Sequence, residues 1–114
     1  GIRMSNTSNA ISPPKAYVIF IKESIQDEVE MGRYKAAVGA SFKGHSPSFL
    51  AAYGALEVLE GAPAEGVVLI EFPDMEKARA WYHSPAYQEA ARHRFAGAVY
   101  RGLIVEGTAP AEMK

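Results

Sequence analysis

Apolar residues along the chain begin with a period of two. In residues 15–24 (KAYVIFIKES), Val18 and Phe20 fall on one face of an extended segment, and Ile19 and Ile21 fall on the other. This spacing predicts a β-strand. Because both of its faces are apolar, the strand should be covered on both sides.

The period then changes to that of a helix over residues 24–44 (SIQDEVEMGRYKAAVGASFKG). Ser24 is the predicted N-cap, Asp27 completes a capping pattern three residues later, and Gly44 is a plausible stop. Acidic residues near the start suit the helix dipole. The stripe predicted to be buried follows helical spacing and consists of Ile25, Val29, Gly32 and Ala36.

The second half of the chain repeats this alternation. Residues 46–61 predict a strand with a bulge at Gly54, although their alanines also permit a helix. Residues 66–73 (GVVLIEFP) predict a strand that ends at a proline. Asp74 should cap one helix, and Ser84 followed by Pro85 should begin another. The last predicted strand is VYRGLIVEG, residues 99–107.

The resulting order, β-α-β-β-α-β, predicts a ferredoxin-like α+β fold: a four-stranded antiparallel sheet with both helices on one face. VIFI in the first strand and VVLI in the third would then expose an apolar face on the other side. Burying one aliphatic side chain stabilises a protein by roughly 1.5–3 kcal/mol. We expect a second copy of the chain to cover this face and form a dimeric α+β barrel. The alternative is that the N-terminal segment or loops cover it.

The length and composition of the chain indicate a single domain. The chain has 114 residues, a net charge of −1 and no cysteine. Such a charge favours neither nucleic acid nor an anionic membrane as a partner, and the lack of cysteine fits a reducing cytosol. We expect a flexible arm over residues 1–14, the domain over 15–107 and a loose tail over 108–114. Residues 1–3 are interpreted as a tag scar and Met4 as the native start.

The stretch WYHSPAYQEAARHR, residues 81–94, holds most of the candidate chemistry. Trp81 is expected in the core, whereas Tyr82 and Tyr87 fit either the core or a pocket wall. His83 could satisfy a helix end or transfer protons, and Arg94 could pair with a ligand carboxylate or with a glutamate: Glu60, Glu71 or Glu106.

Several kinds of site have no support in the sequence. His45, His83 and His93 lack metal-ligand spacing, and His93 is expected at the surface. No glycine-rich phosphate cradle and no nucleophile-elbow sequence is present, so neither a nucleotide nor a serine hydrolase is indicated.

The segments VLEG, VVLIEFPDMEKARAWYHSPAYQEAARHR and LIVEG resemble domain-of-unknown-function family 1330, in the dimeric α+β barrel superfamily. The resemblance covers about residues 15 to 107 and implies a homodimer with one cleft per subunit. His83, where the family often has an acidic residue, and HSPSFLAAYGA, where a glycine-rich turn is usual, depart from its pattern. The family's recurrent positions fall on Tyr34, Glu60, Gly61, Glu71, Phe72, Ala78, Trp81, Tyr82, Ser84, Tyr87, Arg94, Glu106 and Gly107.

The expected function is that of a soluble homodimer with a small, mostly apolar pocket in each subunit. It would bind, and in one version transform, a small aromatic or carboxylate-bearing molecule without a tightly bound cofactor. Tyr34, Tyr53 and Tyr100 could line a cleft between the sheet and the first helix. The alternative is a binding or assembly module without chemistry. The candidate catalytic residues are His83 and Arg94, and the candidate ligand-binding residues are Tyr34, Tyr53, Trp81, Ser84 and Tyr87.

Overall fold

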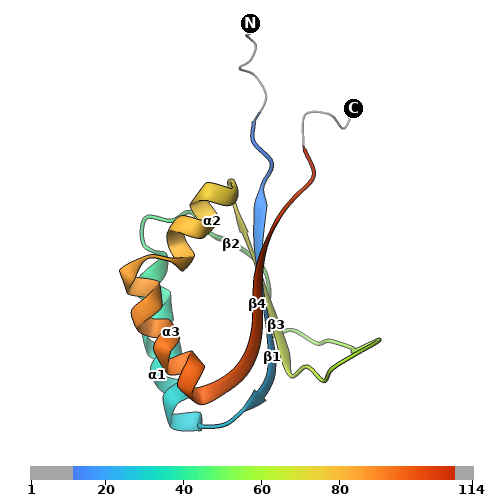
Figure 1. Ribbon diagram of the computed structural model, residues 1–114, viewed down its shortest axis with the longest axis vertical. Coiled ribbons are helices and arrows are strands. Elements are labelled where there is room, and N and C mark those ends of the chain that lie inside the picture. The colour runs from blue at the N-terminus through green and yellow to red at the C-terminus, as the bar shows by residue number, and fades with distance from the viewer. Residues whose placement is uncertain (1–11, 110–114) are drawn as a thin grey trace, which may run out of the picture.

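A four-stranded antiparallel sheet, in the order β2-β3-β1-β4, carries all helices of the described chain on one face (Figure 1). The structure is a computed structural model that describes residues 12–109. The predicted ferredoxin-like α+β fold is confirmed, and most of the predicted arm and tail lie outside the described residues. The elements are β1 (Ala16–Ile25), α1 (Glu28–Val38), the 3-10 helix η1 (Gly39–Phe42), β2 (Ser48–Ala52), β3 (Gly66–Phe72), α2 (Met75–Tyr82), α3 (Pro85–Gly97) and β4 (Ala98–Glu106).

The core lies between the sheet and the helices. Every second residue is buried along β3 and in the first half of β1, and the register places Val18 opposite Ile70 and Phe20 opposite Val68. These side chains meet the fully buried Trp81 of α2. The period-two pattern had placed Val18 and Phe20 on one face of the strand, and the structure shows that this is the face the helices cover.

Helix α1 begins three residues later than the sequence suggested. Asp27, not Ser24, is its N-cap, and the Asp27 carboxylate accepts hydrogen bonds from the backbone N–H groups of Val29 and Glu30. Ser24 still belongs to β1, where it lies opposite Val99. The prediction for Ser24 was wrong because the pairing of β1 with β4 continues past a bulge and delays the start of the helix.

The later start also changes which face of α1 is buried. Met31 and Tyr34 are buried, whereas Val29, predicted to be buried, is 64% exposed. The predicted stripe was therefore wrong at Val29, Gly32 and Ala36, which are all exposed, because the largest apolar side chains of the helix, Met31 and Tyr34, take the sheet-facing positions. The helix ends at Val38, and after η1 the chain turns at Gly44, whose φ of 83° suits glycine.

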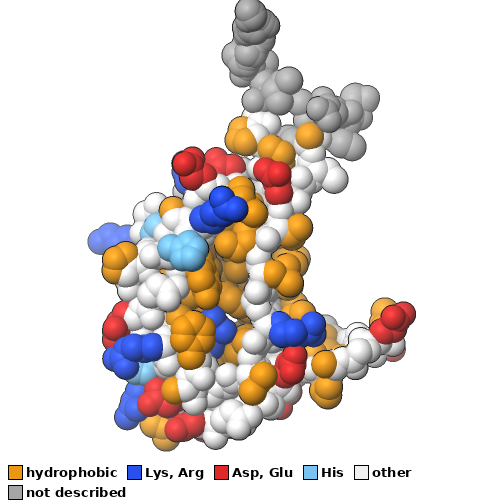
Figure 2. All heavy atoms as spheres, in the orientation of Figure 1, with side chains coloured by type: hydrophobic (Ala, Val, Ile, Leu, Met, Phe, Trp, Pro, Cys, Tyr) orange, Lys and Arg blue, Asp and Glu red, His pale blue; other side chains and the backbone are white. Residues whose placement is uncertain are grey.

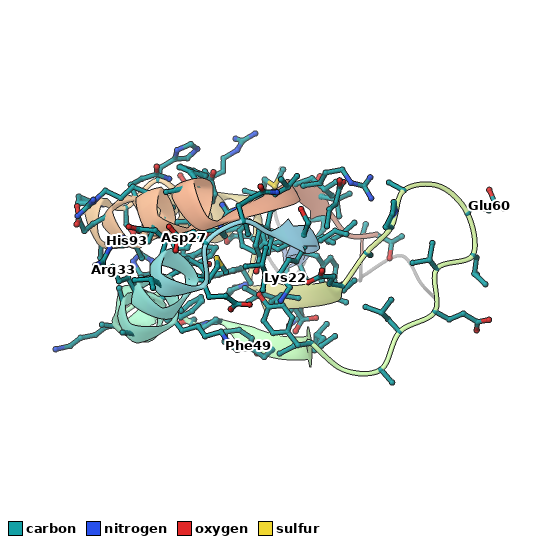
Figure 3. The ribbon with its side chains drawn as sticks, turned by 90° about the horizontal axis from the view of Figure 1, so that it is seen from below. Lys22, Asp27, Arg33, Phe49, Glu60 and His93 are labelled. Carbon is teal, nitrogen blue, oxygen red and sulfur yellow. The ribbon has the colours of Figure 1, made fainter. Side chains whose placement is uncertain are left out.

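Strand β2 is much shorter than predicted. It spans Ser48–Ala52, and its register shifts between Phe49 and Ala51, so the bulge lies there and not at Gly54. Residues 53–65, with almost every side chain exposed, project from the sheet on the side away from the helices. Figure 3 shows Glu60 at the outer end of this projection. Alternation in the sequence did not reveal that the strand ends at Ala52.

The helix boundaries in the second half agree with the prediction. The Asp74 carboxylate accepts from the Lys77 N–H at 2.8 Å and caps α2. The Ser84 hydroxyl accepts from the Tyr87 N–H at 3.2 Å and caps α3, with Pro85 at the first helical position. The capping residues could be predicted from the sequence because each side chain makes its hydrogen bond within the first turn of its own helix.

The second sheet face is apolar at its centre. Ile19 lies opposite Leu69 on one side and opposite Leu103 on the other, and Leu103 is 48% exposed. No described element covers this face in Figure 1. Within residues 12–109, no helix has the length and apolar character needed to cross a membrane.

Candidate functional site

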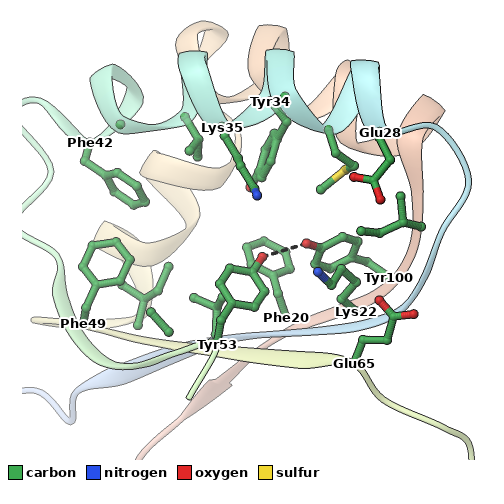
Figure 4. Close-up of a pocket in the computed structure, with 18 of the residues that line it drawn as sticks. Phe20, Lys22, Glu28, Tyr34, Lys35, Phe42, Phe49, Tyr53, Glu65 and Tyr100 are labelled. Carbon is green, nitrogen blue, oxygen red and sulfur yellow. Dashed lines mark hydrogen bonds between the residues drawn. The ribbon is translucent and has the colours of Figure 1, made fainter. Parts of the chain in front are cut away.

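A cavity of about 770 Å³ lies between α1 and the sheet. Figure 4 shows how side chains from α1, η1 and the strands surround this large cavity. The space is large enough for a small organic molecule, and aromatic walls are typical of such sites. Seven of the lining residues are aromatic: Phe20, Tyr34, Phe42, Phe49, Tyr53, Trp81 and Tyr100.

Trp81 lines the large cavity and is itself fully buried. Its ring stacks on Phe42, with the centroids 4.8 Å apart, and its indole N–H donates to the Ser41 hydroxyl at 3.1 Å. The prediction that Trp81 belongs to the core is confirmed, and the same ring forms part of the cavity wall. A rigid wall of this kind is fixed before any ligand arrives.

Tyr53, which comes just after β2, also lines the large cavity (Figure 4). Its backbone adopts a φ of 60°, which is uncommon for a residue other than glycine. Its ring lies directly against Gly66, where any larger residue would collide with it. This conformation brings the Tyr53 hydroxyl within 2.7 Å of the Tyr100 hydroxyl. Local backbone strain that positions a side chain at a cavity is typical of functional sites.

Charged side chains surround this tyrosine pair. Lys22, Lys35, Glu28 and Glu65 all line the large cavity (Figure 4). The Lys22 ammonium lies 5.0 Å from the centre of the Tyr53 ring. Within residues 12–109, neither lysine has a carboxylate within 4 Å, so both ammonium groups are available to an anionic oxygen.

A chain of buried polar groups runs behind the large cavity. The Arg94 Nε–H donates to the Tyr87 hydroxyl at 3.2 Å, and that hydroxyl lies 3.0 Å from the Tyr34 hydroxyl. Burial raises the pKa of the Tyr34 and Tyr87 phenols, although the Arg94 charge opposes this effect at both. Burial and the Tyr53 hydroxyl also raise the pKa of Tyr100. These phenols therefore stay protonated at neutral pH and act as hydrogen-bond donors rather than as bases.

A second cavity, of about 510 Å³, lies between the helix layer and β4. Figure 2 shows a hollow on this side of the molecule, with hydrophobic side chains inside and basic and histidine side chains near its rim. Tyr82 and His83 from the end of α2, Arg94 and Phe95 from α3, and residues 98–100 and 102–104 line this small cavity.

The structure does not bring the predicted site residues together in one space. Tyr34, Tyr53 and Trp81 line the large cavity, whereas His83 and Arg94 line the small one. The two remaining candidates line neither of these cavities: Ser84 caps α3, and Tyr87 is fully buried among aromatic rings.

Two of the charged residues differ from expectation. No described carboxylate, including those of Glu60, Glu71 and Glu106, lies within 4 Å of the Arg94 side chain. His93 is not simply a surface residue, because its side chain is 17% exposed and its Nδ1 lies 2.7 Å from a carboxylate oxygen of Glu30. This contact joins α3 to α1.

Several cavity residues were not identified from the sequence. Lys22 had a detectable signal, because it continues the inward-facing run of Val18 and Phe20 at a spacing of two. Lys35 and Phe49 had none, since their positions depend on how α1 crosses the sheet and on the bulge in β2. Among the described residues, no group of three or more His, Asp or Glu side chains could hold a metal ion.

The fold and the cavity define an α+β protein of the ferredoxin-like type. The chain belongs to the family described as domain of unknown function DUF1330, whose model matches residues 15–108. This confirms the resemblance stated from the sequence. None of the curated proteins matches the chain.

Solved structures with the same fold have little sequence in common with this chain. A protein of unknown function from Rhodopseudomonas palustris is 15% identical, with a TM-score of 0.65 over 88% of this chain and 87% of that one. A dimeric protein of unknown function and ferredoxin-like fold from Bacteroides fragilis is 14% identical, with a TM-score of 0.55 over 83% and 98%. SnoaB, a cofactor-independent oxygenase from Streptomyces nogalater, is 14% identical, with a TM-score of 0.56 over 85% and 98%.

Proposed function

We propose that this protein binds a small aromatic molecule that carries an anionic oxygen, in the large cavity and without a tightly bound cofactor. The observation that carries the proposal is the cavity of about 770 Å³, with seven aromatic lining residues and two lysines that have no carboxylate within 4 Å in the described part of the chain. Aromatic walls favour a flat apolar body, and a few convergent polar groups fix its orientation.

The polar groups that would orient the ligand are close to one another. The hydroxyls of Tyr53 and Tyr100 share one hydrogen bond, which leaves one O–H free to donate to an acceptor. The ammonium groups of Lys22 and Lys35 approach the same region in Figure 4. A phenolate or carboxylate oxygen placed between these hydroxyls and the two ammonium groups would gain charge-assisted hydrogen bonds, whereas Glu28 and Glu65 on the same cavity would repel it elsewhere.

The proposal includes a homodimer formed through the open sheet face. Ile19, Leu69 and Leu103 are adjacent on that face, and residues 53–65 project on the same side, with Leu59 82% exposed. A second copy would remove this surface from water. The dimeric state named for the Bacteroides fragilis protein supports the idea by analogy of fold.

Whether the bound molecule is also transformed separates two versions of this function. The cofactor-independent oxygenase among the structures of the same fold supports an enzyme by analogy alone. The version in which His83 transfers a proton has weaker support, because His83 lines the small cavity rather than the large one. The simpler version is a binding module, with Lys22 and Lys35 as the ligand's counter-ions.

The experiment uses Trp81, the only tryptophan of the chain, as a reporter in the cavity wall. Tryptophan fluorescence is recorded while phenols, naphthols and aryl carboxylates are titrated, with cyclohexanol as the non-aromatic control. Gly32→Leu should weaken binding, because Gly32 lines the cavity and has open space around it. Ala36→Leu is the matched control, since it adds the same side chain to an exposed position of α1 outside the cavity.

Quenching that saturates for an anionic aromatic compound, and that Gly32→Leu reduces while Ala36→Leu does not, supports the proposal. The absence of saturable quenching by every aromatic compound contradicts it. Incubating a bound compound with the protein under air and under argon then separates the two versions. A new product by mass spectrometry identifies an enzyme, and unchanged compound identifies a binding module.

A further inference from the structure

The Arg94 guanidinium is a buried cation without a counter-ion in the described chain. The residue is 5% exposed, and no carboxylate from residues 12–109 lies within 4 Å of it. Taking a charge out of water is costly unless it is paired. A guanidinium cannot relieve that cost by losing its proton, because its pKa is too high.

Aromatic rings compensate for part of this cost. The guanidinium carbon lies 4.6 Å from the centre of the Phe20 ring, 4.9 Å from that of Tyr100 and 5.0 Å from that of Phe95. Such contacts cover the faces of the guanidinium but do not use its N–H groups. Among the described residues, the Tyr87 hydroxyl is the single hydrogen-bond partner of the Arg94 side chain, and it engages Nε. The terminal N–H groups therefore have no acceptor within residues 12–109.

Arg94 lines the small cavity, which lies at the free edge of the sheet. Apolar side chains that include Val18, Phe95 and Ile104 form part of the cavity wall, beside the polar groups of Tyr82, His83 and Tyr100. His83, an exposed residue at the end of α2, lines the same cavity and adds a ring nitrogen. The small cavity therefore combines a cation that has no carboxylate partner among residues 12–109 with apolar side chains on part of its wall.

We propose that the small cavity is a binding site for the carboxylate of a small organic acid, with Arg94 as its main recognition group. The planar guanidinium can give two parallel N–H···O bonds to a carboxylate, and His83 contributes a further N–H at the entrance. The apolar walls contact the hydrocarbon or aryl part of the acid. This site goes beyond the proposed function, because the residues that carry it do not line the large cavity.

The test is a nuclear magnetic resonance titration of the full chain with benzoate, and with benzamide as its uncharged analogue. Benzoate should shift the Arg94 Nε–H signal and the backbone amides of residues 98–104, whereas benzamide should not. Signals from Gly32 and Lys35 report separately on the large cavity, so failure of one proposal can be told from failure of the other.

Two variants test the role of charge. Arg94→Met keeps most of the side-chain volume but removes the cation, and His83→Glu places a negative charge at an exposed position on the cavity. Each should weaken benzoate binding by about tenfold or more. Arg92→Met is the matched control, because Arg92 is exposed on the same helix and pairs with Glu89 outside the cavity.

The His83→Glu variant keeps the test decisive if Arg94→Met does not fold. A benzoate shift at Arg94 that His83→Glu weakens and Arg92→Met leaves unchanged supports the site. An unshifted Arg94 signal at saturating benzoate overturns the proposal, and so does equal binding of benzamide.

Discussion

The hydroxyl groups of Tyr53 and Tyr100 lie 2.7 Å apart, although the two residues come from opposite edges of the sheet. Tyr53 follows β2 and Tyr100 lies in β4, so their side chains together reach across β3 and β1. Both residues line the large cavity. The hydrogen bond therefore fixes the polar end of the candidate site by joining elements that are far apart in the sequence.

We predict that Tyr53→Phe lowers the free energy of unfolding by about 0.5–1.5 kcal/mol, the usual net value of one hydrogen bond. Urea denaturation measures this change. Tyr100→Phe should cost a similar amount, and the double variant should cost less than the sum of the two, because both single variants remove the same bond. Strictly additive losses would show that the two hydroxyls do not interact.

We predict a loss of stability in alkali that comes from the buried tyrosines. Burial raises the pKa of Tyr34, Tyr87 and Tyr100 in the folded chain above the value of about 10 in the unfolded chain. The folded state then holds protons that the unfolded state has lost. The resulting stability is complete below about pH 10 and declines as the pH rises from there toward the folded-state pKa values.

Tyrosinate absorbance near 295 nm, recorded together with circular dichroism, measures this effect. The buried tyrosines should ionise only as the secondary structure is lost. Tyr34→Phe should reduce the slope of stability against pH above pH 10 and leave it unchanged near neutrality. Full ionisation of all six tyrosines near pH 10 in a folded protein would be incompatible with the buried network.

We predict that Asp27→Ala destabilises the protein by about 0.5–2 kcal/mol, the usual cost of removing an N-cap. The Asp27 carboxylate accepts hydrogen bonds from two backbone N–H groups at the start of α1. Ser24→Ala is the control, because Ser24 lies in β1 and makes no cap. Equal urea midpoints for Asp27→Ala and the unchanged protein would contradict this boundary of the helix.

We predict that Leu69→Lys converts a homodimer into monomers. Leu69 lies opposite Ile19 on the open sheet face, where a second copy would bury it and where an unpaired charge is costly. Val29→Lys is the control, because Val29 is 64% exposed on α1, away from that face. Sedimentation equilibrium should give twice the chain mass of 12.3 kDa for the control and a single chain mass for Leu69→Lys. The chain mass alone for the unchanged protein at micromolar concentration would refute the dimer.

The local features of the fold could be read from the sequence. The strands β1 and β3, and the caps at Asp74 and Ser84, were predicted correctly because each depends on neighbours within a few residues. The same reasoning failed at Ser24, where a good capping residue is held in a strand by its pairing with β4. Pairing with a distant strand decides where such a helix begins, and the local spacing of apolar residues does not reveal that pairing.

The residues of the candidate site were likewise predicted only in part from the sequence. The sequence identified three tyrosines as possible lining of a cleft beside the first helix: Tyr34, Tyr53 and Tyr100. Large amphipathic rings on elements that face the core commonly lie either in the core itself or in the wall of a cleft. The sequence also grouped His83 and Arg94 with these tyrosines, since all lie on the covered side of the sheet.

By itself, then, the sequence determined the order of the elements and the apolar character of both sheet faces, because hydrophobic periodicity is a local property of the chain. Only the tertiary structure decided that Arg94 and His83 face a separate cavity and that Tyr53 reaches Tyr100. Those relationships depend on the angle at which helices cross the sheet, on the bulge in β2 and on where each buried side chain finds space. These are properties of the packed molecule rather than of any one segment.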